Sequence, residues 1–439
     1  MVNISEISDD SNDGGDPNKK PEELDKKPKE EAVLRSTRNE NRNKKPEEED
    51  VEEEEDVAEE KEEEEERRST SFPLPNDVTE ALVALIRRCD YPSLSSVSRY
   101  FSGLIASSSL YETRARLGLS ETFLYASIRY STTNDLQSWH ILHRNKASSL
   151  RLTKLGSLPP VPWGASVVTI GLEMYVIGGI IDLTRSKVMN VIDCRTHKCR
   201  SLPPMRRGRN KAAAGVIDGK IYVIGGFRKR CPLESEWIEV FDLEKQIWES
   251  LPGPYPESST SSQFRTYVVM EDKIYILDYK GCLVYEPKRR RGDEWDASAV
   301  GAAHPIKNMW KESFAVQCVV DDMLYTVDRR CTLGHPIVVY DPKEKTWRPV
   351  KGESLRRLPN YIVHPASEMA NFGGKLAILG SKRSYVHGDC IGREKGIWCA
   401  MIVLEKREGG EIWGNVESLD CVLGGINHLT VRLCRTLTI

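Results

Sequence analysis

The first 70 residues contain no aromatic side chain and very few apolar ones. They carry 27 acidic and 13 basic residues, and residues 47–66 hold sixteen carboxylates with Lys61 as the only cation. Such a segment cannot bury enough apolar surface to offset the entropy lost on ordering. We therefore predict a disordered acidic tail over residues 1–70. The net charge is −14 for the tail and −3 for the whole chain, so residues 71–439 carry +11.

Long apolar runs are missing as well. No stretch approaches the roughly 18–20 apolar residues that a membrane span needs, and the N-terminus has no apolar signal core. We therefore expect a soluble protein of the cytoplasm, the nucleus or both, with no membrane partner. The basic cluster Lys26-Lys27-Pro28-Lys29 fits a nuclear import signal, but a solvated charge run inside the tail is the favoured interpretation.

Cysteine pairs at metal-binding spacing are absent too. The eleven cysteines form no C-x-x-C motif, and Cys318, Cys399 and Cys434 lie within apolar, strand-like runs. This distribution is typical of reduced, buried thiols. Cys194 and Cys199 are too isolated from other ligands to indicate zinc.

What the chain does have is an internal repeat. Residues 164–180 read GASVVTIGLEMYVIGGI, and 47 residues later residues 211–227 read KAAAGVIDGKIYVIGGF. Each copy is an apolar run, a tight turn and a second apolar run, which is typical of a β-hairpin. The second run recurs with spacings of 47, 53, 50 and 52 residues, centred on Tyr175, Tyr222, Tyr275, Tyr325 and Ala377.

Two more strands follow each hairpin. A third apolar run ends near an acidic residue in each copy, over residues 188–193, 237–242, 282–286, 337–341 and 400–405. A fourth strand is marked by a tryptophan, or by Cys199 in the first copy, and the tryptophans are Trp248, Trp295, Trp347 and Trp413. Four strands in about 50 residues is the period of a kelch propeller blade. The first two copies resemble kelch repeats closely, with Gly178-Gly179 and Gly225-Gly226, whereas the later copies lack the double glycine.

The resemblance implies an all-β kelch-type propeller over residues 121–439. Five motifs are complete, and residues 123–128 and 136–142 at the front and 426–439 at the back are left over. Trp139 stands where a fourth-strand tryptophan is expected. We predict that strands from the two ends build a composite blade, which gives six blades of four antiparallel strands, with five blades as the alternative.

The segment before the repeats changes to a helical period. Val78, Leu82, Leu85 and Ile86 share one helix face, with Asn76 or Asp77 placed to cap the helix. Further signals divide the rest of the segment: Pro92 opens a second helix, Ser109-x-x-Glu112 forms a capping box, and Gly118 ends the last helix. About 45 residues make a small independent core, which favours a module completed by a partner.

The pattern Leu74-Pro75-x-Asp77, an apolar helix, Tyr91-Pro92-x-Leu94 and a Val97-to-Ile105 run resembles an F-box. With the repeats behind it, the chain is similar to the plant F-box/kelch-repeat proteins. The resemblance implies a small all-α F-box over residues 71–120 that docks on a Skp-type adaptor and, through it, on a cullin. The propeller would hold a protein target for ubiquitination. The positions that match the docking surface, several of which could instead form the module's own core, are Leu74, Pro75, Leu82, Leu85, Ile86, Leu94, Val97 and Leu104.

Some kelch propellers are enzymes, but the residues of this chain do not indicate one. Asp193-x-x-x-His197 matches the second half of the iron triad E-x-x-x-D-x-x-x-H, yet Met189 occupies the Glu position. His140 and His143 fall on opposite faces of a predicted strand. We predict no catalytic residue, no metal and no cofactor. A kelch enzyme, and a scaffold acting outside a ligase, remain the alternative functions.

Strand alternation also predicts a target-binding face. The loops after the second and fourth strands of every blade emerge on one side, and they are rich in cations. A face of one sign attracts an oppositely charged partner, so we expect an acidic or phosphorylated protein target. Nucleic acid is disfavoured because no set of stacking aromatics is interleaved. Two plainer interpretations stay open: loops simply collect charge, or the acidic tail folds back on this face. The predicted residues are Arg206, Arg207, Arg209, Arg228, Arg230, Arg329, Arg330, Arg356, Arg357, Lys382 and Arg383.

Overall fold

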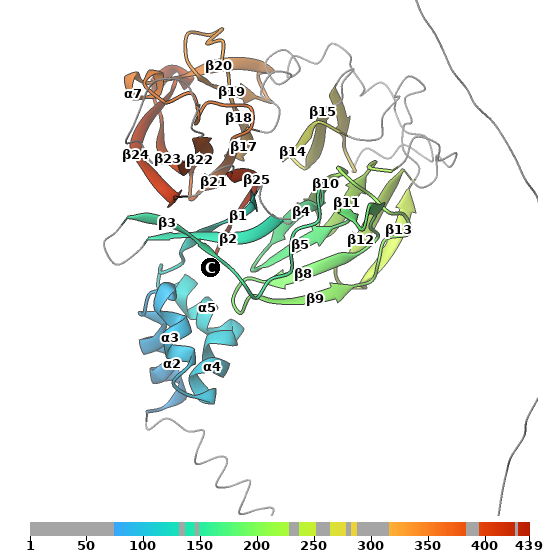
Figure 1. Ribbon diagram of the computed structural model, residues 1–439, viewed down its shortest axis with the longest axis vertical. Helices are drawn as coiled ribbons and strands as arrows, with labels where there is room; N and C mark the ends of the chain where they lie inside the picture. The colour runs from blue at the N-terminus through green and yellow to red at the C-terminus, as the bar shows by residue number, and fades with distance from the viewer. Residues whose placement is uncertain are drawn as a thin grey trace, which may run out of the picture. The chain divides into compact units, whose positions relative to one another are not determined.

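The computed structural model describes residues 74–130, 137–144, 149–227, 237–251, 264–277, 282–287, 316–382, 395–425 and 429–439 (Figure 1). The predicted tail lies outside the described residues. In the described part, the helices up to residue 116 precede the sheets, and two short helices lie between later strands. No helix there is long and apolar enough to cross a membrane. The helices are α2 (Asn76–Ala84), η1 (Arg88–Asp90), α3 (Tyr91–Ser95), α4 (Arg99–Ala106), α5 (Ser108–Arg116), α7 (Glu353–Arg356) and η4 (Glu408–Gly410).

The ends of the first helices differ in part from the sequence signals. Pro75 precedes α2 and no side chain caps that helix, so neither Asn76 nor Asp77 serves as its cap. The predicted capping box at Ser109 is wrong by two residues, because Ser107 is the N-cap of α5 and its hydroxyl accepts from the Leu110 amide. Pro92 does lie in the first turn of α3, and Gly118 follows α5 with a φ of 69°.

The strands form propeller-like blades of antiparallel sheet. Three sheets have the strand orders β4-β5-β8-β9, β10-β11-β12-β13 and β14-β15-β16. Two further four-stranded units, β17-β18-β19-β20 and β21-β22-β23-β24, are joined by a short parallel pairing of β20 with β24.

The strand bounds follow the chain in order. The first group is β4 (Ser166–Ile170), β5 (Glu173–Ile177), β6 (Ile180–Ile181), β7 (Thr184–Arg185), β8 (Met189–Asp193) and β9 (Lys198–Leu202). The second is β10 (Ala213–Ile217), β11 (Lys220–Ile224), β12 (Ile238–Asp242), β13 (Ile247–Leu251), β14 (Thr266–Met270), β15 (Lys273–Leu277) and β16 (Cys282–Tyr285). The last is β17 (Gln317–Val320), β18 (Met323–Val327), β19 (Ile337–Asp341), β20 (Thr346–Lys351), β21 (Glu368–Phe372), β22 (Lys375–Lys382), β23 (Gly396–Lys406) and β24 (Ile412–Gly424).

The predicted hairpin turns are confirmed: they lie between the first and second strands of the sheets, at the predicted positions. Asp321 and Asp322, between β17 and β18, have φ values of 49° and 56°. Both turn residues have positive φ at 218–219, 271–272 and 373–374 as well. This backbone matches the twist of the flanking strands and favours aspartate and glycine, which occupy all of these positions except Glu271.

Strands from both ends of the repeat region share one sheet, as predicted. Its order is β25-β1-β2-β3, with bounds β25 (Leu429–Thr438), β1 (Thr122–Tyr130), β2 (Gln137–Arg144) and β3 (Leu150–Lys154). The backbones of Glu121 and Ile439 exchange two hydrogen bonds of 2.7 and 2.9 Å at its end. The placement of Trp139 in a fourth strand is wrong: Trp139 lies in β2, the third strand of this sheet, and the fourth strand is β3, which no sequence pattern predicts.

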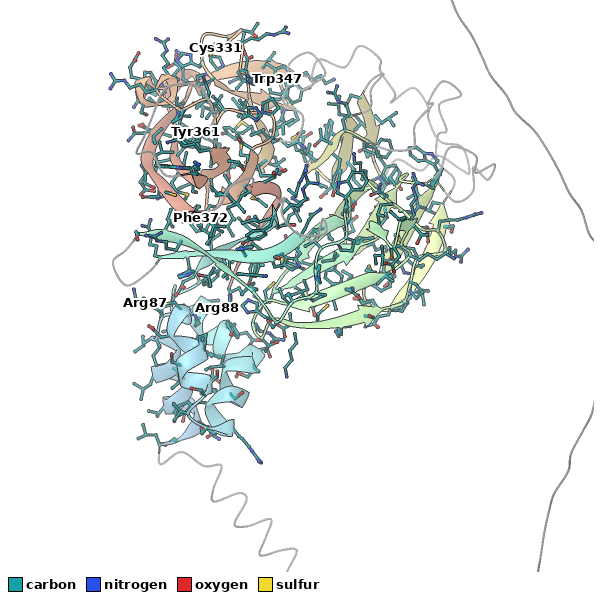
Figure 2. All side chains as sticks on the ribbon, viewed as in Figure 1. Arg87, Arg88, Cys331, Trp347, Tyr361 and Phe372 are labelled. Atoms are coloured by element: carbon teal, nitrogen blue, oxygen red, sulfur yellow. The ribbon has the colours of Figure 1, made fainter. Side chains whose placement is uncertain are left out.

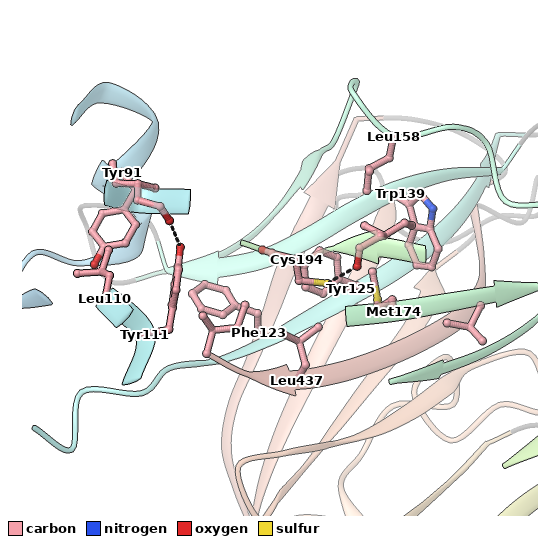
Figure 3. Close-up of a cluster of buried hydrophobic side chains, with 14 of the residues drawn as sticks. Tyr91, Leu110, Tyr111, Phe123, Tyr125, Trp139, Leu158, Met174, Cys194 and Leu437 are labelled. Atoms are coloured by element: carbon pink, nitrogen blue, oxygen red, sulfur yellow. Dashed lines mark hydrogen bonds between the residues drawn. The ribbon is translucent and has the colours of Figure 1, made fainter. Parts of the chain in front are cut away.

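The first strand of each sheet contacts the next, beginning with β4, β10 and β14, continuing through β17 and β21 to β25, and returning to β4. The helices join the sheets through a common core (Figure 3). Tyr91, Leu110 and Tyr111 of the helices belong to the same cluster of buried side chains as Phe123 of β1 and Met174 of β5.

Candidate functional site

An apolar stripe runs along the outer side of α2. Val78 and Leu82 lie on α2 one turn apart, Leu85 is the residue at its C-terminal end, and Leu74 stands two residues before its start. With Val97, these side chains are 40–68% exposed. The opposite side of α2 buries Val83 and Ala84 in the module's core. Large apolar side chains gathered on one exposed helix face are typical of a protein-binding surface. We call Leu74, Val78, Leu82 and Leu85 the α2 stripe.

The eight predicted docking residues divide into two groups. Five are exposed: Leu74, Pro75, Leu82, Leu85 and Val97. Ile86, Leu94 and Leu104 are half-buried and pack against the buried cluster of Figure 3. The predicted set omits Val78, which is exposed on the same face of the helix.

A buried arginine links the helices to the sheets. Arg88, labelled beside exposed Arg87 in Figure 2, is buried, and its Nη2 donates to the carbonyl oxygen of Cys194. Its guanidinium carbon lies 4.6 Å from the ring centroid of Phe123. The helical module is therefore held to the first sheets by a charged hydrogen bond and an aromatic contact.

Asp193 and His197, which match part of the iron triad, are both hydrogen-bonded to other protein groups. His197 is hydrogen-bonded to the Tyr125 hydroxyl at 2.9 Å, and burial, assisted by the nearby Arg88 charge, lowers the pKa of His197 to about 4. Asp193 accepts from the backbone and the side chain of Arg195. His140 is buried and is bonded to the Tyr130 hydroxyl at 2.8 Å, whereas His197 is half-buried. Within the described ranges, no group of three potential metal ligands converges.

Loops after the second and fourth strands meet on one face around the sheets that contain β5 and β11. The Gly179 amide donates to the Arg209 carbonyl at 2.8 Å, and the Lys211 amide donates to the Gly164 carbonyl at 2.8 Å. These bonds tie the loops 155–165, 178–188 and 203–212 together. The geometry agrees with the expected emergence of these loops on one side.

Arg209 is not available on this face. Its side chain is 1% exposed, and its Nη2 lies 2.9 Å from Oε1 of Glu239, which is 0% exposed. Its Nη1 also donates to the carbonyl oxygens of Gly225 and Trp237. The prediction that Arg209 contacts a target is therefore corrected. The residue holds loops together, and its partner Glu239 lies 30 residues away, where no local pattern indicates it.

The other predicted cations are distributed differently. Arg206, Arg329, Arg330, Arg356 and Arg357 are exposed, and Arg356 lies 3.3 Å from Glu353. Arg207 and Lys382 are half-buried, and Nζ of Lys382 lies 5.6 and 5.2 Å from the ring centroids of Tyr361 and Trp398. Arg228, Arg230 and Arg383 lie outside the described residues.

Two exposed apolar residues on the same face were missed. Trp163 is 42% exposed, and Nζ of Lys211 lies 4.7 Å from its ring centroid. Leu183 stands at the tip of the β6–β7 hairpin, an element too short to leave a periodic pattern. No sequence signal marks either residue, because other apolar residues, such as Leu158 and Val161, stand in the same loops and are buried.

Comparison with known proteins gives consistent relatives. Residues 132–423 match a family model described as FKB95, Kelch-repeats domain. Two kelch repeat-containing proteins of Arabidopsis thaliana are 70% and 69% identical to the chain, each over 100% of both sequences. An F-box/kelch-repeat protein of the same plant is 43% identical over 83% of this chain and 92% of its own length.

Proposed function

Because the chain belongs to the plant F-box/kelch-repeat proteins, we propose that it is the substrate-recognition adaptor of an SCF-type ubiquitin ligase. In this proposal, residues 71–120 are an F-box that binds a Skp-type adaptor and through it a cullin, and residues 121–439 are a propeller that binds the protein target. The proposal also places the protein in the cytoplasm, the nucleus or both.

The observation that carries the proposal is the α2 stripe. A small helical module with a packed core gains nothing from four large apolar side chains in water, whereas a partner that covers them gains their burial, at roughly 25 cal/mol per Å². The relative that is 43% identical is named an F-box/kelch-repeat protein, and this name supports the same interpretation.

We further propose that the propeller has six blades. The closed succession of first strands from β4 to β25 and back to β4 supports this number. The sheet β25-β1-β2-β3 is then the composite blade that closes the ring. This arrangement leaves no long unpaired edge, which protects the chain from strand addition by other proteins.

The target in this proposal is an acidic or phosphorylated protein segment. Exposed Arg206 and Lys211 lie on the face where the loops 155–165, 178–188 and 203–212 meet. Pairs between exposed charges weaken as salt is added, so the affinity for the target should fall between about 50 and about 500 mM salt. An unchanged affinity over that range would contradict the electrostatic part.

The second candidate is a non-enzymatic kelch scaffold acting outside any ligase. The observation in its favour is that the relatives at 70% and 69% identity are named for their kelch repeats alone. An enzyme is a weaker alternative, and the kelch and F-box/kelch names of the relatives point to adaptors or scaffolds instead.

Co-expression with a plant Skp-type adaptor separates the ligase receptor from the scaffold. We expect the full chain and the adaptor to co-elute in size-exclusion chromatography, and we expect a Leu74→Ala/Pro75→Ala variant to elute alone. An intact chain that binds no adaptor of this type would favour the scaffold.

A further inference from the structure

The tip of the β6–β7 hairpin combines backbone strain with exposure. Asp182 and Leu183 form its two-residue turn, with φ values of 47° and 61°. Turns with positive φ at both positions favour Asn-Gly, and a bulky residue with positive φ is uncommon. Yet Leu183 is 97% exposed. The position therefore carries both a strained backbone and an apolar side chain in water, a combination that indicates function rather than folding.

A second apolar side chain stands beside the base of this hairpin. The amide of Ile180, the first residue of β6, donates to the carbonyl oxygen of Trp163 at 2.9 Å. Leu183 follows Ile180 by three residues, at most about 10 Å of extended chain. The Trp163 ring is 42% exposed, with the Lys211 ammonium over it. Tryptophan is among the residue types that dominate binding energy at interfaces.

The hairpin is held firmly at its base. The Ser186 amide donates to the carbonyl of Gly179 at 2.9 Å, and the Arg209 amide donates to the carbonyl of Ser186 at 3.0 Å. A Cβ on Gly208 would meet the Arg185 carbonyl oxygen at 2.3 Å, so the two loops touch with no space between them. A preformed hairpin loses little entropy when a partner binds.

The charge around the hairpin selects the partner. In the loops 155–165, 178–188 and 203–212, Asp182 is the one carboxylate, whereas the exposed or half-buried cations include Arg185, Lys187, Arg206 and Lys211. The nearby Glu239 is buried and neutralised by Arg209. A partner here needs acidic groups for the cations and a large apolar side chain for Trp163 and Leu183.

We propose that Leu183 and Trp163 are the apolar anchor of the target-binding site, which takes an acidic protein segment carrying a large apolar side chain. The inference rests on the proposed function and adds the apolar requirement to it. The acidic stretch 47–66 of this chain supplies charge but no leucine or aromatic residue, so it lacks the apolar group that the site requires. The occupant in this proposal is a segment of another protein.

Peptide selection tests the inference without knowledge of the target. Displayed short random peptides are selected on the full chain, and the peptides obtained are measured against three variants: Leu183→Gly, Trp163→Ala and, as a matched control, Leu333→Ser. Leu333 is also an exposed leucine in a loop after the second strand of a sheet. We expect selected peptides with a leucine or aromatic residue among Asp and Glu, bound about tenfold or more weakly by the first two variants and normally by the control.

Several outcomes would overturn the inference. These are no enrichment, acidic peptides without an apolar residue, equal binding to Leu183→Gly, or equally tight binding of a synthetic peptide of residues 47–66. Glycine relieves the strain at position 183, so that variant should melt at the same or a higher temperature and still co-elute with the Skp-type adaptor. If the unmodified chain does not bind the Skp-type adaptor but still selects the expected peptides, the ligase role is contradicted and the apolar anchor is supported.

Discussion

Arg209 and Glu239 form a fully buried ion pair that organises the loops of the propeller face. Oε1 of Glu239 accepts hydrogen bonds from Nε and Nη2 of Arg209, at 3.0 and 2.9 Å. Its other oxygen, Oε2, accepts a hydrogen bond from the backbone amide of Arg206 at 2.7 Å. A residue of β12 thereby fixes the loop that precedes β10. The loop presents Arg206 to solvent because Arg209 is held inside.

Replacing Glu239 with alanine should therefore be strongly destabilising. The variant leaves the Arg209 charge buried without a counter-ion, and breaking such a pair costs about 3–5 kcal/mol. Denaturant unfolding of the full chain measures the change. Arg206→Ala, on the exposed side of the same loop, should change the unfolding free energy by no more than about 0.5 kcal/mol. Similar losses for the two variants would contradict the structural role of the pair.

Arg88→Ala should weaken the attachment of the helices to the sheets. The substitution removes the donor to the Cys194 carbonyl and the contact with Phe123, and an unsatisfied buried group costs about 1–3 kcal/mol. Calorimetry should show a lower melting temperature or a separate early transition for the helices. Arg87→Ala is the matched control, because Arg87 is the neighbouring residue and its side chain is 60% exposed. A wild-type thermogram for Arg88→Ala would contradict the account.

His197 should make stability depend on pH below neutrality. Burial first, and the Arg88 charge second, lower the pKa of His197 to about 4 in the folded protein, from an ordinary value of 6.5. The unfolded chain therefore takes up the proton first as the pH falls. The stability due to the neutral ring is complete above pH 6.5 and is lost progressively between pH 6.5 and about 4.

The test compares unfolding free energies at pH 7 and pH 5. His197→Gln can still bond to the Tyr125 hydroxyl but does not titrate, so its loss of stability between the two pH values should be smaller than that of the unmodified chain. His143→Gln is the control substitution, because the His143 ring bonds to Thr153 at the surface, away from Tyr125. Equal pH dependence in all three proteins would rule out His197 as the source.

The repeat could be predicted from sequence because its signals are local. Turn residues such as Asp321-Asp322 and the strands centred on Tyr175 or Tyr222 follow from patterns within ten residues of chain. The missed elements lack such patterns: β3 bears no marker residue, and β6 and β7 have two residues each. The burial of the Arg209 side chain depends on its contact with Glu239, 30 residues away, and no sequence periodicity predicts such a contact.

The candidate binding surfaces, too, could be predicted only as far as local sequence patterns allow. The apolar face of α2 could be read from its period, but the sequence could not separate exposed Leu85 from half-buried Ile86, which depends on how the helices pack. Leu183 and Trp163 needed the tertiary structure, because exposure of a single apolar residue has no signature in sequence.

The most direct test of the central claim is the affinity of the full chain for a plant Skp-type adaptor, measured by calorimetric titration with the unmodified protein and Leu85→Ala. Leu85 is 64% exposed on the α2 stripe, so its truncation should leave the fold intact. We predict specific binding that weakens by about 2 kcal/mol in Leu85→Ala, roughly 30-fold, and that is unchanged in Leu183→Gly. An unmodified chain without measurable affinity, or a Leu85→Ala variant with full affinity, would contradict the account.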